Sequence, residues 1–253
     1  MAYLIGMASL AYLFAWYGNL IPASIDARPI NANTTGLLWE CLLINFFLFV
    51  GFGIQHSVMA RPAFKERLSS IIPEFLERST FVLVSGIALL LMLVLWQPLG
   101  GTLWSLENQV VRCCLHLGYV VGWIIVVGST FALSHTDFFG LRQAWYGASR
   151  KRYTPIKFSV PLLYRLVRHP LYVGLILLSW STPEMSAAHL LFSGMVTGYI
   201  VTAIRWEERD LVETHGDDYR RYQQATPRLF PRMTFLARIR GFFSTTPNTT
   251  RRV

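Results

Sequence analysis

The chain has 253 residues, of which 53% are hydrophobic and only 15% charged. Because soluble domains average about 25% charged residues, this composition excludes an ordinary soluble domain and indicates an integral membrane protein. The net charge of +9 does not indicate nucleic-acid binding, since the basic residues gather beside apolar runs and belong to no nucleic-acid-binding motif. The three cysteines lack CxxC spacing and are interpreted as small apolar helix residues.

Four apolar stretches in the first half of the chain are predicted to be transmembrane helices. Each is close to the ~20 residues that a helix needs to cross the hydrocarbon core of a bilayer. They cover residues 3–20, 37–58, 80–99 and 113–133.

A fifth apolar region, 171–206, is too long for a single span. The sequence STPEMS interrupts it at 181–186, where proline and glutamate predict a turn. The expected structure is therefore a helical hairpin, whose arms are 171–180 and 187–205. The first arm is short, so it crosses the bilayer only if the turn lies inside the membrane or the arm extends back through Pro161.

The positions of Lys and Arg predict the orientation. Four lie in the loop 57–79, seven in the loop 135–169 and ten in the tail from Arg205. The positive-inside rule places all three basic regions, and with them the N-terminus and the C-terminal tail, in the cytoplasm. A hairpin keeps the basic tail on that side, whereas a single fifth span would not.

The expected fold is an all-α integral membrane protein with four transmembrane helices, a C-terminal helical hairpin and a cytoplasmic tail. Residues 1–134 are expected to form the four-helix transmembrane region. Residues 135–253 are expected to form a functional core made of a cytoplasmic loop, the hairpin 170–206 and the tail. The sequence leaves the oligomeric state open.

Two polar sequences flank the hairpin on its cytoplasmic side. RLVRHPLYVG begins at Arg165 and leads into the first arm, and RWEERDLVETHGDDYRRYQQATPRLFPR begins at Arg205 and follows the second. The hairpin brings them together into a polar pocket. Its arginines suit a carboxylate, its glutamates suit an amine or ribose hydroxyls, and its aromatic rings suit an adenine or a sulfonium. Neither a P-loop nor a GxGxxG sequence is present, so a phosphate-binding loop is not indicated.

The combination of RHPLYVG, about 35 apolar residues, EE and GDDYRRYQQATPRLFP resembles the isoprenylcysteine carboxyl methyltransferase superfamily. Those membrane-embedded enzymes use S-adenosylmethionine (SAM). GFGIQHSVMARPAFK and ERSTFVLVSGIALLLMLVLWQP are similar to the NnrU membrane proteins, and SHTDFFGLRQAW is similar to bacterial methanethiol S-methyltransferases. The resemblance implies a multi-pass protein of the bacterial inner (cytoplasmic) membrane that transfers a methyl group from SAM to the sulfur of a small thiol. With methanethiol the product would be dimethyl sulfide.

The resemblance also implies which residues hold SAM. The arginine and histidine of the RHP motif would orient its amino-acid end or its adenine edge, and the tyrosine and glycine that follow would line the adenosine. The glutamate pair would meet the ribose or the amino group, and the tail would cover the site. The expected SAM-binding residues are Arg168, His169, Pro170, Tyr172, Gly174, Glu207, Glu208, Tyr219, Arg221 and Tyr222. No metal site is expected.

A base for the thiol is expected in the sequence SHTDFFG. A free thiol is mostly protonated at neutral pH, and a nearby base or the sulfonium charge favours the thiolate. His135 is the candidate base, because imidazole accepts a proton near neutral pH, and Asp137 is the candidate that orients it. The alternative is that these two residues only end the fourth helix.

Three further alternatives remain open from the sequence. In the first alternative, the arginines beside the hairpin only anchor the helices at the membrane surface, and the glutamates only form salt bridges with neighbouring arginines. In another, His56 and His135 would bind haem or a metal in a non-enzymatic NnrU-like protein. A methyltransferase that acts on an isoprenylcysteine or a lipid would share the same motifs, because acceptor choice depends on pocket shape.

Overall fold

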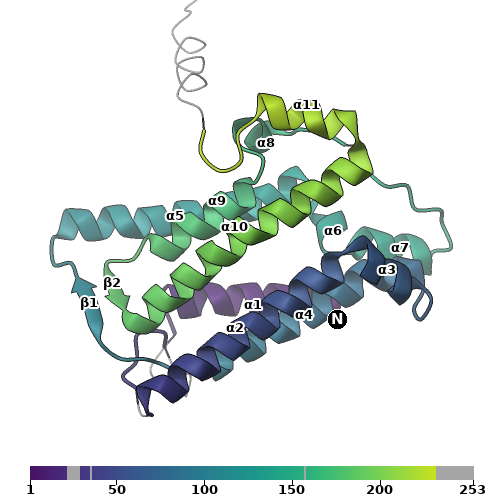
Figure 1. The fold of residues 1–253 in the computed structure, drawn as a ribbon. Helices are drawn as coiled ribbons and strands as arrows, with labels where there is room; N and C mark the ends of the chain where they lie inside the picture. Colours follow the sequence, from purple (N-terminus) through teal and green to yellow (C-terminus); the bar gives the residue numbers. More distant parts are fainter. Residues whose placement is uncertain (22–28, 35, 157, 232–253) are drawn as a thin grey trace, which may run out of the picture.

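The computed structural model describes residues 1–21, 29–34, 36–156 and 158–231, so the expected tail beyond these lies outside the described residues. Most of this part is helical (Figure 1). In chain order its elements are α1 (Ala2–Tyr17), α2 (Leu38–Ala60), α3 (Pro62–Ser69), α4 (Glu74–Leu95), β1 (Thr102–Ser105), α5 (Gln109–Ala132), α6 (His135–Phe138), α7 (Leu141–Ala148), α8 (Leu162–Leu166), α9 (Pro170–Trp180), β2 (Glu184–Ser186), α10 (Ala187–His215) and α11 (Asp217–Ala225).

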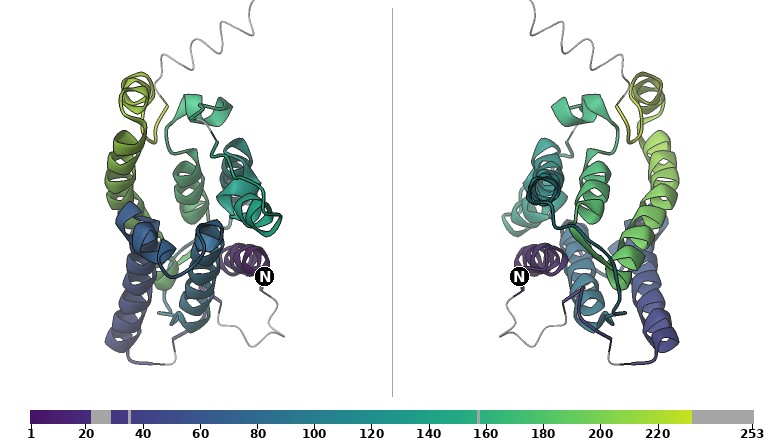
Figure 2. Two further views of the ribbon diagram at one scale, coloured as in Figure 1. Left: turned by 90° about the vertical axis from the view of Figure 1, so that its right-hand side faces the viewer. Right: turned by 90° about the vertical axis from the view of Figure 1, so that its left-hand side faces the viewer.

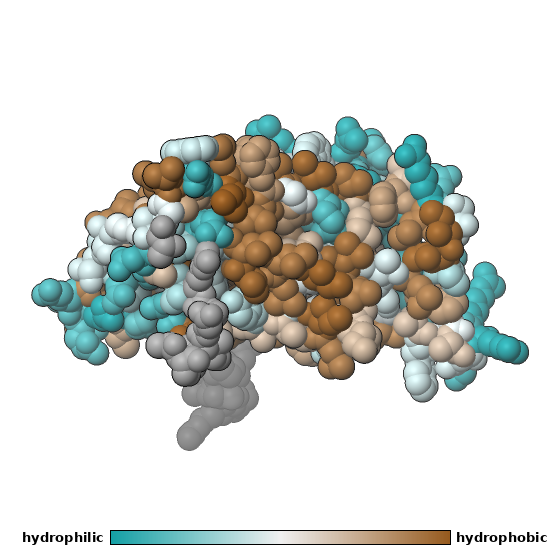
Figure 3. All heavy atoms as spheres, turned by 90° about the horizontal axis from the view of Figure 1, so that it is seen from below, coloured by the Kyte–Doolittle hydropathy of each residue, from teal (hydrophilic) through white to brown (hydrophobic). Residues whose placement is uncertain are grey.

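Four helices of the described part are long and apolar enough to cross a membrane: α2, α4, α5 and α10. This confirms the expectation of a mostly helical protein with several apolar helices long enough to cross a membrane. The four differ from those indicated by the sequence, because α1 has only 16 residues and ends at Tyr17, whereas α10 has 29. Figure 3 shows a broad hydrophobic band across the middle of one face, with hydrophilic residues gathered toward both ends.

The expectation of an all-α fold is wrong in one respect, because β1 and β2 form a two-stranded antiparallel sheet. Trp104 pairs with Met185 in this sheet. Gly100 and Gly101, with φ values of 65° and 64°, adopt a backbone conformation open mainly to glycine and turn the chain after α4. The pairing joins the α4–α5 connection to the turn of the hairpin at one end of the molecule (Figure 1).

The hairpin turns where the sequence predicts. α9 ends at Trp180, and α10 begins at Ala187 after the STPEMS segment. At 1.5 Å per residue α9 spans only about 16 Å, roughly half of a bilayer core. The chain then runs from the end of α9 to the start of α10 as a non-helical segment that contains β2. α10 extends to His215, which is beyond the expected end of the arm at residue 205. The polar sequence that follows the apolar stretch is thus part of the same helix.

Glycines allow two pairs of helices to pack closely. Where α5 meets α9, a Cβ on Gly122 would lie 2.8 Å from the Leu178 Cβ, and one on Gly174 would lie 2.7 Å from the Gly122 carbonyl oxygen. The two backbones therefore meet directly, as is common between membrane helices. α1 meets α4 at Gly6 and Gly86 in the same manner. Figure 2 shows α1 beside α4, and α9 between α5 and α10.

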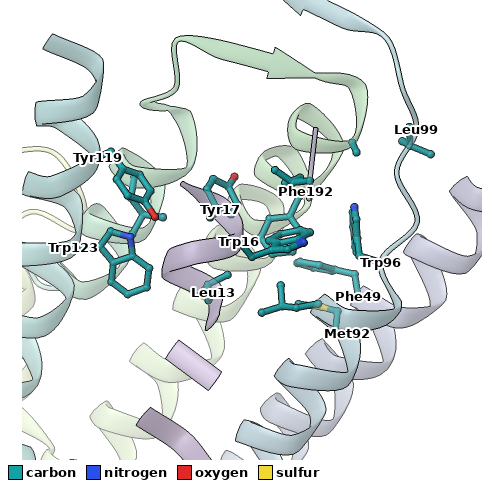
Figure 4. Close-up of a cluster of buried hydrophobic side chains, with 14 of the residues drawn as sticks. Leu13, Trp16, Tyr17, Phe49, Met92, Trp96, Leu99, Tyr119, Trp123 and Phe192 are labelled. Carbon is teal, nitrogen blue, oxygen red and sulfur yellow. The ribbon is translucent and has the colours of Figure 1, made fainter. Parts of the chain in front are cut away.

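An aromatic core lies at the end of the bundle where α1 and α4 end and α10 begins. Trp16 and Trp96 are buried and meet Phe192 edge-on, with ring centroids 5.2 and 5.1 Å from it (Figure 4). Asn45, which is also buried, exchanges hydrogen bonds of 2.8 and 2.7 Å with the backbone of Gln97. These bonds satisfy polar groups that the end of α4 would otherwise leave unpaired.

The described parts of the three basic regions lie together at the opposite end of the bundle. Figure 1 shows the N-terminus, α3, α6 and α7 at this end, and α10 rises toward α11 on the same side. β1 and β2 lie at the other end. The positive-inside rule predicts this separation for a bundle that crosses a bilayer.

Candidate functional site

The two motif sequences meet at the end of the bundle that carries the basic loops. Pro170 is the first residue of α9, a position that suits proline because no helical N–H is lost there. Glu207 and Glu208 come after the first 20 residues of α10, which begins at Ala187, and about 20 helical residues are what a hydrocarbon core requires. α8 and α11 pack beside each other above them (Figure 1).

Glu208 is the centre of a buried charged cluster. Its side chain is 4% exposed, and Oε1 accepts hydrogen bonds from Arg168 Nε at 2.8 Å and from His169 Nε2 at 3.1 Å. Oε2 accepts from Arg228 Nε at 3.1 Å and from Gln223 Nε2 at 3.3 Å. The carboxylate thus has four donors, and these charge-assisted hydrogen bonds offset the free-energy cost of burying it.

Arg168 uses its whole guanidinium within this cluster. Its Nη2 lies 2.7 Å from Glu208 Oε1, and its Nη1 donates to the carbonyl oxygens of Gln223, at 2.9 Å, and of Thr226. The backbone N–H groups of the motif's arginine and histidine donate to the two carbonyl oxygens that follow Thr226. The tail after α11 is therefore clamped to the start of α9, and Arg168 has no nitrogen left for a ligand.

Glu207 points in another direction, because neighbouring residues of a helix lie about 100° apart around its axis. Its side chain is 41% exposed, and Oε2 accepts a hydrogen bond from the Tyr172 hydroxyl at 2.8 Å. Tyr172 stacks on His169, with ring centroids 5.4 Å apart. An accessible carboxylate beside a stacked aromatic pair offers an acceptor for an amine or hydroxyl group and a flat surface for a ring or a cation.

The tyrosines of α11 join this helix to the segment before α9. Tyr219 is buried, and the Tyr222 hydroxyl donates to the carbonyl oxygen of Tyr164 at 2.6 Å. Phe158 packs edge-on against both rings. Burial raises the pKa of Tyr222 to about 12 and also raises the pKa of Tyr219, so both hydroxyls stay protonated near neutral pH. They therefore stabilise the cover over Glu208 as neutral groups.

Three of the expected SAM-binding residues, all in the described part of the chain, form no hydrogen bond or ion pair with either glutamate of the EE sequence. Gly174 faces α5, where the absence of a side chain permits the close helix contact. Arg221 pairs with Asp218 at 2.6 Å and is 76% exposed. Pro170 is buried at the start of α9. Their assignment to SAM rests on the resemblance alone.

His135, the expected base, has both ring nitrogens in hydrogen bonds. Nδ1 lies 3.0 Å from the Thr130 hydroxyl, and Nε2 lies 3.1 Å from the Tyr3 hydroxyl. The ring also stacks on Phe131, with centroids 4.4 Å apart. These contacts favour the structural alternative, and they also link the end of α5 to α1.

Asp137 organises the loop after α5. Its carboxylate accepts hydrogen bonds from Tyr153 at 2.8 Å, Arg142 at 3.0 Å and Ser134 at 2.8 Å. Burial by itself raises the pKa of Asp137, but these hydrogen bonds outweigh it and lower the pKa. Within the described ranges no hydrogen bond joins this carboxylate to His135, so the structure does not bring the two together as a base and its orienting group.

The alternative of a metal site is tested by the ligand side chains in the described part of the chain. No group of three or more His, Cys, Asp or Glu side chains there is arranged to hold a metal ion. His56 lies between the rings of Phe52 and Phe81, and its Nδ1 is 3.2 Å from Ser85 Oγ. His56 thus packs α2 against α4.

Sequence reasoning does not single out three members of the cluster, Gln223, Thr226 and Arg228. They lie in QQATPRLFP, which belongs to the motif pattern through its prolines, so a signal was present. The specific residues were not recognisable, because a carboxylate accepts hydrogen bonds equally well from many polar side chains and backbone groups.

A separate cavity of about 360 Å³ lies toward the other end of the bundle, between the ends of α1 and α9 and the first half of α5. Tyr17, Tyr119 and His189 are among its lining residues. None of the expected site residues lines it, so this cavity is distinct from the charged cluster.

Comparison with known proteins identifies the family. The chain is 42% identical over 226 residues to the methanethiol S-methyltransferase of Crocosphaera subtropica, covering 89% of this chain and 87% of the relative. It is 41% identical over 228 residues to methanethiol S-methyltransferase 2 of Bradyrhizobium diazoefficiens, covering 89% and 85%. It is 38% identical over 234 residues to the methanethiol S-methyltransferase of Mycobacterium tuberculosis, covering 91% and 93%. No family model matches the chain, and no solved structure matches it significantly. The chain belongs to the methanethiol S-methyltransferase family.

Proposed function

We propose that this protein transfers the methyl group of SAM to methanethiol and releases dimethyl sulfide and S-adenosylhomocysteine (SAH). The observation that carries the proposal is an identity of 38–42% to methanethiol S-methyltransferases over about nine-tenths of the chain. The charged cluster supports it, because the RHP and EE sequences that resemble those of SAM-dependent membrane methyltransferases meet there.

The described residues fit SAM, since a half-exposed carboxylate lies beside a stacked aromatic pair. When bound, SAM would supply a methyl group on a sulfonium. Methanethiol would give up its proton to a base or to water, its sulfur would form a C–S bond to the methyl group as the sulfonium C–S bond breaks, and SAH would be the leaving group. Glu208 and Arg168 hold α9, α10 and the tail in place around this position. The site lies where α10 leaves the apolar layer, and exclusion of water there favours a reaction in which opposite charges cancel.

The proposed location is the bacterial inner membrane, with the N-terminus and the tail in the cytoplasm, where SAM is available. The gathering of basic residues at the end that carries the cluster supports this orientation. Residues 1–134 would form the transmembrane region and residues 135–253 the SAM-binding core. The contact between α5 and α9 would join the two.

The experiment is a direct assay of the product. The purified protein in detergent is mixed with SAM and methanethiol, and dimethyl sulfide is measured in the headspace by gas chromatography. Product is expected with the wild type and not when SAM is omitted. A parallel calorimetric titration measures SAH binding.

The two readouts separate the alternatives. No dimethyl sulfide with intact SAH binding would overturn methanethiol as the acceptor and direct the assay to an isoprenylcysteine or a lipid amine. No product and no SAH binding would overturn the methyltransferase proposal itself. A Soret band in the absorption spectrum would then favour the haem-binding alternative.

A further inference from the structure

The amino-acid end of SAM carries a carboxylate and an ammonium, so a site that binds it needs a cation and an anion close together. The arginine of the RHP motif does not supply the cation, because Arg168 is bound by Glu208 and by carbonyl oxygens of the tail. Glu208 is saturated by its four donors in the same way. The charged pair that meets SAM must therefore come from other residues.

A second charged group lies on the neighbouring face of α10. Glu207 and Asp210 are three residues apart and share this face. Arg61, where α2 ends, lies against it, with Nη1 2.7 Å from Asp210 Oδ2 and Nε donating to the carbonyl oxygen of Ser57 at 3.2 Å. Glu207, which accepts the hydrogen bond of the Tyr172 hydroxyl, therefore lies about one helical turn from the carboxylate that Arg61 meets.

Arg61 keeps hydrogen-bonding capacity at this position. Nη1 is buried and forms an ion pair with Asp210 at 2.7 Å without the angles of a hydrogen bond, and Nη2 has no partner in the part of the chain that the structure describes. A guanidinium has five N–H donors, so donors of Arg61 remain for a further acceptor. A carboxylate is the acceptor that best matches the planar fork of a guanidinium.

The other cations near the cluster are placed less well for a carboxylate. Arg228 is 56% exposed and donates from its Nε to Glu208. Arg209 is 73% exposed and pairs with Glu213 one turn along α10. Arg61, by contrast, is held by α2 and α10 together.

We propose that Arg61 and Glu207 bind the amino-acid end of SAM, Arg61 through the carboxylate and Glu207 through the ammonium. Glu208 is a positioning residue that holds α9 and the tail beside them. The inference rests on the proposed function, since it concerns the co-substrate of that reaction. It adds a residue of the sequence SVMARPAFK, outside both motifs, to the SAM site.

The test compares two ligands that differ only in this end of the molecule. SAH contains the amino acid, and 5′-methylthioadenosine keeps the adenine, ribose and sulfur without it. Both are titrated calorimetrically into the full-length protein in detergent. We expect Arg61→Gln and Glu207→Gln each to weaken SAH binding about tenfold or more, as the loss of a charge-assisted hydrogen bond predicts, and to leave 5′-methylthioadenosine binding within about twofold.

Two variants serve as controls. Arg209→Gln removes an exposed arginine of α10 and should leave both affinities unchanged, whereas Glu208→Gln should weaken both ligands together. Retained binding of 5′-methylthioadenosine shows that the Arg61 and Glu207 variants are folded.

Three results would overturn the inference. One is unchanged SAH binding in Arg61→Gln, and another is an equal loss of both ligands in Glu207→Gln, which would place this carboxylate at the ribose. The third is that Arg228→Gln loses the preference for SAH over 5′-methylthioadenosine while Arg61→Gln keeps it. Failure of the wild type to bind SAH would instead overturn the proposed co-substrate and the inference with it.

Discussion

Two carboxylates at the same end of the protein are the centres of polar clusters that are built differently. Asp137 takes its donors from residues 134–153, all close to it along the chain. Glu208 takes its donors from the RHP motif, about 40 residues earlier, from α11 and from the segment after α11. The first cluster shapes one loop. The second joins α9, α10 and the tail, so the geometry of the candidate SAM site depends on it.

Glu208→Gln is the change from which we expect the largest effect. It keeps the size of the side chain but leaves Arg168, which is 7% exposed, without its counter-ion. Breaking a buried pair costs about 3–5 kcal/mol of stability. Because the cluster positions the proposed SAM site, SAH binding and dimethyl sulfide formation should also fall, by roughly 100-fold or more. Calorimetry and the headspace assay measure both. Activity near that of the wild type would show that the cluster does not hold the site.

Gly174→Ala separates packing from ligand binding. The new Cβ would lie 2.7 Å from the Gly122 carbonyl oxygen, so we expect a loss of about 1–3 kcal/mol in stability and a lower Tm. Gly198→Ala on α10, where a Cβ meets nothing within 4 Å, is the control and should not lower the Tm. An unchanged Tm with lost SAH binding in Gly174→Ala would instead place this glycine at the adenosine.

His135→Ala tests whether the loop that follows α5, which contains His135 and Asp137, takes part in catalysis. Because both ring nitrogens already bind Thr130 and Tyr3, we expect kcat to stay within about threefold of the wild type while the Tm falls. Loss of a general base would instead lower kcat by about 10²–10⁴-fold. Tyr3→Phe, which removes one partner of the imidazole, should lower the Tm without changing kcat.

Asp137→Asn is expected to have the smallest effect, and its effect should depend on pH. Hydrogen bonds lower the pKa of Asp137 in the folded protein, so its contribution to stability is present above the unfolded pKa, about 3.9, and is lost as the pH falls through the folded pKa. The Tm of the wild type should therefore exceed that of the variant near neutral pH, and the difference should shrink toward acid. A difference that is constant with pH would contradict this role of the carboxylate.

Much of the fold could be predicted from the sequence, because hydropathy and charge act on short stretches of chain. The turn of the hairpin follows from one proline and one glutamate inside an apolar run, and the orientation follows from the basic loops. The end of α1 was predicted less well. The predicted span continued to Leu20, whereas the helix ends at Tyr17, before Gly18 and before Asn19, whose φ is 55°.

The sequence by itself determined that the chain is a membrane protein of this family and that the RHP and EE motifs meet at the end of a hairpin. Tertiary structure alone decided which carboxylate is buried and which is accessible. Glu207 and Glu208 are chemically identical neighbours. Their environments differ because the turn of the helix directs Glu208 toward Arg168 and the tail and directs Glu207 toward Tyr172. Whether a carboxylate such as that of Glu208 has all of its hydrogen-bond partners depends on residues far away in the sequence. No local sequence pattern predicts which residues those are.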